Sequence, residues 1–248
     1  MVKEKTQFKR LFLDIEVSPN IVTSWSIGRK INLDYHSIIQ ERAVICICWK
    51  WEGEKQVHSL TWDKGDDKKM LEKFSKVLEE AQEVLGHNGD TFDLKWLRTR
   101  CILYGIPMIP DIHSVDTLKL SRKGFRFNSN KLDYIAKYLG VGRKIKTSPD
   151  LWNRILLKNE VKAMEEMVKY CKMDVVVLEN VFKKLSPYVL SKSHKGVAEG
   201  KSKDSCPECG SVHSQHRGSS ITSKGLRKQR LQCQDCGKYW SINLTKND

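Results

Sequence analysis

The first quarter of the chain shows the pattern of β-strands, with apolar residues that alternate with polar ones or form short continuous runs. Residues 11–17, 21–28, 43–51 and 56–62 are rich in β-branched and aromatic side chains and are separated by polar or glycine-containing turns. From residue 66 the apolar positions follow the three- and four-residue spacing of an amphipathic helix. The pattern therefore predicts a group of N-terminal strands followed by helices.

Helices and strands alternate in the remainder of the first 188 residues. Helices are predicted over residues 66–81, 90–104, 131–139 and 158–185, and a short strand over residues 83–88. Gly140 directly follows the third helix, where glycine commonly ends helices. Strands first, then helices mixed with strands, indicate an α/β domain with a central mixed sheet flanked by helices.

The charge of the chain points to an anionic partner. Of its 248 residues, 44 are Lys or Arg and 30 are Asp or Glu, for a net charge of +14. This excess favours nucleic acid or an anionic membrane surface as the partner. Because no run of 18 apolar residues exists and the N-terminus has no secretory apolar segment, we expect a soluble cytoplasmic protein with no membrane partner.

Cysteine spacing predicts a second, C-terminal domain. Residues 189–204 are rich in Ser, Lys, Gly and His, and we predict a flexible linker there between a domain at 1–188 and another at 205–248. The last segment contains two Cys-x-x-Cys pairs, whose four thiolates suit one structural Zn²⁺ ion in a zinc ribbon: Cys206, Cys209, Cys233 and Cys236. The other four cysteines are interpreted as small core residues: Cys46, Cys48, Cys101 and Cys171.

Acidic residues recur at points where a strand or helix would hold them in place. Asp14 and Glu16 share one face of the first strand, Asp93 begins a helix directly after a strand, and Tyr170 and Asp174 lie one helical turn apart. Each of these acidic residues also has a purely structural explanation. Asp14 and Glu16 suit a solvated edge, Asp93 suits a helix dipole, and Asp174 could pair with a lysine. Together they would form an oxygen-donor site for Mg²⁺ or Mn²⁺, while Asp90 suits a helix cap.

The order Asp14-Ile15-Glu16, Asn88 to Asp93 and Tyr170 to Asp174 resembles the DEDD 3'-5' exonucleases of the ribonuclease H-like superfamily, which include proofreading domains of DNA polymerases. The resemblance covers about residues 9–185. The Tyr-x-x-x-Asp spacing matches the tyrosine subgroup, since the histidine of the other subgroup would stand where this chain has Lys169.

This resemblance implies a two-metal phosphodiesterase with two Mg²⁺ or Mn²⁺ ions. By analogy, Asp14 bridges both ions, Glu16 and Asp174 complete the site that activates water, and Asp93 supports the second ion directly or through water. Tyr170 would orient the attacking water through its hydroxyl. The paired cysteines, with the "CPECGS" and "CQDCGKYW" layout, resemble zinc ribbons of DNA-handling proteins.

Two basic segments are candidates for binding nucleic acid. Residues 121–130 could guide a strand toward the acids, although Phe125 and Phe127 could equally pack this loop inward. The hairpin between the cysteine pairs could contact phosphates, or it could be a solvated hairpin with Trp240 packed on the zinc core. The basic residues concerned are Arg122, Lys123, Arg126, Lys224, Arg227, Lys228 and Arg230.

The sequence thus leads to a two-metal 3'-5' exonuclease for single-stranded 3' ends, with DNA favoured over RNA. The zinc ribbon would aid substrate binding or recruitment, which leaves room for a replication or repair protein as a partner. Two alternatives stay open: a catalytically inactive nucleic-acid-binding or recruitment protein, and a structure-specific endonuclease that uses the same metal site.

Overall fold

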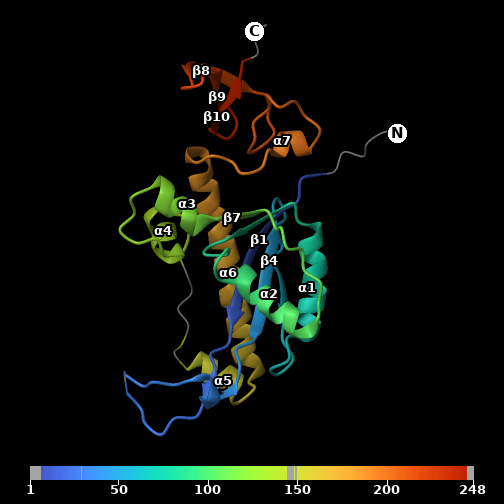
Figure 1. Ribbon diagram of the computed structural model, residues 1–248, viewed down its shortest axis with the longest axis vertical. Coiled ribbons are helices and arrows are strands. Elements are labelled where there is room, and N and C mark those ends of the chain that lie inside the picture. Colours follow the sequence, from blue (N-terminus) through green and yellow to red (C-terminus); the bar gives the residue numbers. More distant parts are fainter. Residues whose placement is uncertain (1–6, 29, 144–147, 149, 245–248) are drawn as a thin grey trace, which may run out of the picture.

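A five-stranded mixed sheet forms the centre of the protein (Figure 1), in a computed structural model that describes residues 7–28, 30–143, 148 and 150–244. The strand order is β5 (His58–Thr61), β4 (Val44–Trp51), β1 (Arg10–Val17), β6 (Glu83–Gly86) and β7 (Ser114–Asp116). β1 pairs antiparallel with β4 and parallel with β6. The predicted α/β fold with a mixed central sheet is therefore confirmed.

Helices cover both faces of this sheet (Figure 1). α6 (Val161–Leu185) contacts β1 and β4 on one face, whereas α1 (Lys68–Glu80) and α2 (Asp93–Tyr104) pack on the other. Because both faces are covered, successive residues of β1 are buried whichever way they point. The buried apolar residues of β1 are Leu11, Phe12, Leu13 and Ile15.

Three shorter helices pack against α6: α3 (Thr117–Gly124), α4 (Leu132–Tyr138) and α5 (Leu151–Leu156). The helix over residues 131–139 was predicted, whereas α5 was not. Among the described residues, no helix has both the length and the apolar character needed to cross a membrane.

The predicted helix over residues 90–104 begins three residues late. Asn88 has a φ of 70°, and residues 88–92 form a turn before α2 starts at Asp93. Asp90 is therefore not the cap of this helix, which corrects the sequence interpretation. Its carboxylate instead accepts hydrogen bonds from Ser114 Oγ at 2.5 Å and Lys119 Nζ at 2.6 Å.

The segment that follows β1 is mostly irregular and does not form the long strand predicted for residues 21–28. Within the segment predicted as a strand over residues 21–28, only β2 (Ile21–Val22) forms, paired with β3 (Ile38–Gln40) after the short 3-10 helix η1 (Tyr35–Ser37). Trp25 and Ile27 are fully exposed, so their side chains do not pack. The composition of this segment favours a strand, but only two of its residues have a partner strand.

The C-terminal part is a three-stranded antiparallel sheet at the end of the molecule near the N-terminus of β1 (Figure 1). It consists of β8 (Ser214–Ile221), β9 (Arg227–Cys233) and β10 (Tyr239–Asn243). Its small core contains Leu231 and Trp240 beside the cysteines, so Trp240 is a core residue as predicted.

The segment between the two sheets is structured and makes contacts with both parts. After η2 (Ser186–Tyr188) it contains the short helix α7 (Lys195–Ala198). Lys192 Nζ donates to the Ser114 carbonyl at 2.7 Å, and the Lys195 amide donates to the Pro207 carbonyl at 2.8 Å. These bonds fasten residues 189–204, which we predicted as a flexible linker, to the sheet on one side and to the C-terminal part on the other.

A buried group of charged side chains, here called the docking network, joins the two parts. Arg10 at the start of β1 contacts Glu83 at 2.5 Å, Glu208 at 2.7 Å and Glu52 at 2.9 Å. Burial alone would lower the pKa of Arg10, but these three carboxylates raise it overall. The network consists of Arg10, Glu52, Glu83, Lys195, Glu208 and Lys238.

Lys238 completes the docking network from the ribbon side. Its ammonium group is almost fully buried and donates to the carbonyls of Ser186, at 2.6 Å, and Val189. Burial lowers the pKa of Lys238, and the carboxylate of Glu208, 3.8 Å away, opposes that shift. Glu208 and Lys238 flank the cysteines, so the cysteine cluster positions both contacts.

Candidate functional site

Three carboxylates from distant parts of the chain meet on one face of the sheet. Asp14 and Glu16 of β1 and Asp174 of α6 each offer an oxygen within 4.8 Å of the other two. Period-two geometry puts the first two on the face of β1 that α6 covers. Asp174 is buried, and Asp14 and Glu16 are half-buried.

The sequence of α6 explains why Asp174 is held there. The residues after it are almost continuously apolar and buried, so the helix cannot rotate without exposing them. The thiol of Cys171 also donates to the backbone carbonyl of Asp14 at 3.4 Å, which ties α6 to β1 at the level of the carboxylates. Tyr170 precedes Asp174 by one turn on the same side of the helix and is half-buried.

Asp93 is not a member of the group of three carboxylates but contacts the strand that carries two of them. It is buried at the start of α2, and its Oδ1 accepts a hydrogen bond from the backbone amide of Ile15 at 3.0 Å. Ile15 stands between Asp14 and Glu16, so Asp93 holds the strand segment that carries them. Burial raises the pKa of Asp93 to about 7, and the charge of Asp116 adds to this although hydrogen bonds to backbone amides oppose it.

The donor set fits hard divalent cations. Three carboxylates with atoms this close repel one another unless a cation or a proton neutralises them. Their ligand atoms are all oxygen, which Mg²⁺ and Mn²⁺ prefer over nitrogen or sulfur. The predicted residues Asp14, Glu16 and Asp174 could therefore hold such an ion directly, and Asp93 could support the site through its hydrogen bond to Ile15.

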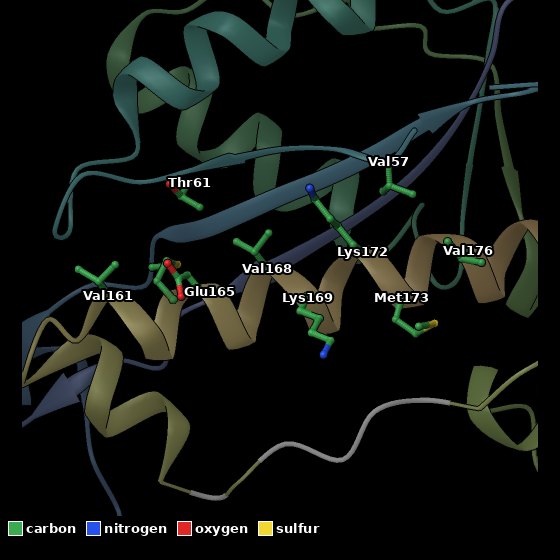
Figure 2. A pocket seen from close by; sticks show the side chains of 10 residues that line it. Val57, Thr61, Val161, Glu165, Val168, Lys169, Lys172, Met173 and Val176 are labelled. Carbon is green, nitrogen blue, oxygen red and sulfur yellow. The ribbon is translucent and has the colours of Figure 1, made fainter. Parts of the chain in front are cut away.

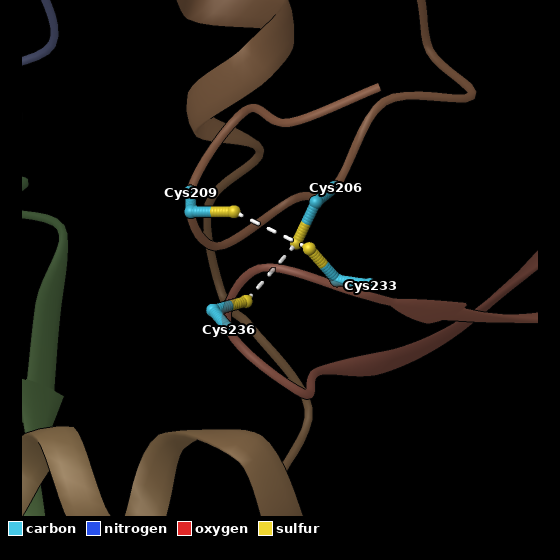
Figure 3. Close-up of side chains that lie close together, drawn as sticks. All are labelled: Cys206, Cys209, Cys233 and Cys236. Atoms are coloured by element: carbon cyan, nitrogen blue, oxygen red, sulfur yellow. Dashed lines mark hydrogen bonds between the residues drawn. The ribbon is translucent and has the colours of Figure 1, made fainter. Parts of the chain in front are cut away.

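The four paired cysteines converge in the C-terminal part (Figure 3). The Sγ atoms of Cys206 and Cys236 are 3.6 Å apart, and those of Cys209 and Cys233 are 3.5 Å apart. A tetrahedral Zn²⁺ ion with Zn–S bonds of about 2.3 Å separates its sulfurs by about 3.8 Å, so the cluster is compatible with a zinc ribbon. Gly210 and Gly237, with φ of 70° and 75°, close the turn after each pair.

Two histidines near this cluster are not part of it. His213 lies in a loop, with its Nδ1 3.6 Å from Asp235. His216 lies on β8. Both side chains are exposed.

The basic candidates are on the surface but in two separate places. Arg122 and Lys123 form the last turn of α3, and Arg126 follows it; all three are exposed. Phe125 and Phe127 stack on each other at 5.4 Å and pack against the main core, so the loop's aromatic residues are turned inward.

The second basic group lies on the ribbon hairpin. Lys224 is in the turn between β8 and β9, and the other three residues are on β9: Arg227, Lys228 and Arg230. Lys228 is half-buried and the rest are exposed.

The docking network is a feature that no sequence pattern predicted. Arg10 and Glu208, which form its central pair, have ordinary surface-residue types and are 198 positions apart. The sequence contains no local signal that pairs them.

Comparisons with known proteins agree with this fold. The sequence profile described as the RNase_H superfamily matches residues 40–186. Among solved structures, a family B DNA polymerase from the hyperthermophilic archaeon Pyrobaculum calidifontis is similar, with a TM-score of 0.57 and 17% sequence identity. The match covers 77% of this chain and 26% of the polymerase, and at this identity it concerns the fold alone. A search of curated proteins returned no match. Because the profile spans more than half of the chain and the sheet has the corresponding fold, this chain belongs to the RNase_H superfamily.

Proposed function

We propose that this chain is a metal-dependent 3'-5' exonuclease of the DEDD tyrosine subgroup. The observation that carries the proposal is the meeting of Asp14, Glu16 and Asp174 within 4.8 Å, with Asp93 bonded to the strand between the first two. The substrate would be a single-stranded 3' end, with DNA favoured over RNA. The similarity to a DNA polymerase is in keeping with a nucleic acid substrate.

The residues of the site would have separate roles in metal binding and in orienting water. Asp14, Glu16 and Asp174 would hold two Mg²⁺ or Mn²⁺ ions, and Asp93 would support the second ion directly or through water. When bound, such ions supply charge neutralisation at the phosphate and a more acidic water. Tyr170, one turn from Asp174, would orient the attacking water through its hydroxyl.

The two basic surfaces would bind the nucleic acid on either side of the carboxylates. Arg122, Lys123 and Arg126 are exposed on the α3 side of the fold, and the ribbon offers a second basic hairpin. Phosphate contacts by such residues give affinity without sequence preference. The ribbon would therefore raise substrate affinity or recruit a replication or repair protein.

The test uses Asp14→Asn and Asp174→Asn with Asp111→Asn, an exposed aspartate, as the matched control. We expect each of the first two to lower Mg²⁺-dependent digestion of 5'-labelled single-stranded DNA by more than about 100-fold, since even residues behind metal ligands contribute about 10–100-fold. Substrate binding should persist, and the control should digest normally.

The product pattern separates the alternatives. A descending ladder of 5'-labelled products supports the exonuclease, whereas one discrete band means an endonuclease. If the protein binds DNA but does not hydrolyse it at high protein concentration with Mg²⁺ or Mn²⁺, the chain is a catalytically inactive binding or recruitment protein.

A further inference from the structure

A second cluster of potential metal ligands lies in the core beside the carboxylates. The Sγ atoms of Cys46 and Cys48 on β4 and Cys171 on α6 all lie within 4.8 Å of one another. None of the three side chains is exposed. The sequence interpretation of these cysteines as core residues is confirmed for their burial, but it does not account for three thiols at one point.

The pairing of β1 with β4 explains the position of this thiol cluster. Cys48 lies directly opposite Asp14, and Cys46 lies opposite Glu16, so both thiols share the face of the carboxylates. Cys171, three residues before Asp174, reaches the same point from α6 and donates to the Asp14 carbonyl. The same three elements, β1, β4 and α6, thus carry an all-oxygen group and an all-sulfur group side by side.

The two groups differ in the ions that they suit. Carboxylate oxygens select hard cations such as Mg²⁺, whereas thiolates select soft ions such as Cu⁺, Zn²⁺ and Cd²⁺. Metal–sulfur bonds of about 2.3 Å around one ion require sulfurs about 4 Å apart in a three-coordinate arrangement, which the observed separations allow.

A groove lies beside the thiol cluster. It lies between β5 and α6, has a volume of about 670 Å³ and is lined by Thr61, Val168 and Lys172 among others (Figure 2). The thiol of Cys48 donates to the Val168 carbonyl at 3.9 Å, and Thr61 is the cross-strand partner of Cys46. Val168 and Thr61 thus link the lining of the groove to two of the three thiols.

We infer that Cys46, Cys48 and Cys171 form a binding site for one soft, thiophilic metal ion, separate from the carboxylates and from the ribbon. The ion replaces three S–H protons with three metal–sulfur bonds, and the protons leave to solvent. The ion enters from the groove between β5 and α6. This inference does not depend on the proposed nuclease activity.

The test counts soft ions on the full-length zinc-loaded protein. Wild type is incubated with excess Cd²⁺ in the presence of Mg²⁺, desalted, and analysed for total zinc plus cadmium per chain. We expect two soft ions per chain, one in the ribbon and one in the thiol cluster, with a thiolate-to-cadmium absorption band that grows as the second ion binds. A count of one in the wild type would overturn the inference without any variant.

Serine variants assign the second ion. Cys171→Ser and Cys46→Ser should each retain one ion, whereas Cys101→Ser, which changes another buried cysteine on α2, should retain two. Two ions in both cluster variants would place the extra ion elsewhere and overturn the assignment. Melting curves that match those of Cys101→Ser verify that the cluster variants are folded.

Discussion

Arg10 is the central cation of the docking network, so we expect the stability of both parts of the molecule to depend on it. Its guanidinium is 2% exposed and contacts Glu83, itself 1% exposed, together with Glu208 of the ribbon and Glu52. Replacing it in Arg10→Met keeps an apolar side chain over Phe182, whose ring lies 5.0 Å from the guanidinium. The change leaves the surrounding carboxylates without their central cation.

The expected cost follows from this burial. Removing one partner of a buried ion pair destabilises a protein by about 3–5 kcal/mol, because the remaining charge is left uncompensated. For a chain of this size each kcal/mol lowers the melting temperature by about 2–4 °C, so we expect a fall of about 10 °C. The matched control is Lys9→Met, which removes an exposed pair with Glu80 and should cost less than about 1 kcal/mol.

Thermal unfolding of zinc-loaded protein, followed by circular dichroism at pH 7, measures both variants. A second measurement is the coupling between Arg10→Met and Glu208→Gln, which should be far from additive because the two side chains contact each other. A difference of less than about 2 °C between the melting temperatures of Arg10→Met and Lys9→Met would be smaller than an uncompensated buried charge causes. In that case the reasoning about the docking network is wrong.

Three further outcomes are expected. Because burial raises the pKa of Asp93 to about 7, above its usual value of 3.8, its neutral form favours the folded state at acidic pH, and this stability is lost as the pH rises through 7. Melting temperatures in metal-free buffer should therefore fall between pH 5 and pH 8 more in the wild type than in Asp93→Asn, and equal slopes would count against this. Replacing Arg227, Lys228 and Arg230 with Gln should reduce the salt dependence of single-strand binding by a slope of about 2, whereas an unchanged slope would mean that the hairpin does not touch phosphates. If the four cysteines of the C-terminal part hold Zn²⁺, its removal by a chelator should raise hydrogen exchange at the start of β1 as well as in the C-terminal part, since Glu208 and Lys238 flank the cysteines; exchange confined to residues 205–244 would show that the parts are independent.

The acidic group was predictable because each of its pieces is defined by local geometry. Period two places Asp14 and Glu16 on one face, and a four-residue step places Tyr170 above Asp174, whatever the rest of the chain does. The apolar run after Asp174 also indicated burial, which the structure confirms. The cysteine pairs were predictable for the same reason, since two short turns determine where four thiols point.

Other features depend on contacts that no local pattern contains. Residues 189–204 have the composition of a linker, and contacts with distant residues, among them those of Lys192, Ser193 and Lys195, fasten them. Asp93 could be placed at a helix start, but its bond to Ile15 depends on how α2 meets β1. The segment over residues 21–28 has strand-forming side chains, yet a strand also needs a neighbour, which the sequence does not specify.

The attachment of the ribbon to the first residue of β1 bears on the length of substrate that the protein would need. A module on a loose tether would reach a second site over a range of distances. Here Arg10, which contacts the ribbon, and Asp14 lie four positions apart on one strand, a separation of about 13 Å at about 3.3 Å per residue. If the proposed function holds, a nucleic acid that contacts both the ribbon and the carboxylates must exceed a minimum length set by this attachment, and shorter strands would reach only one of the two.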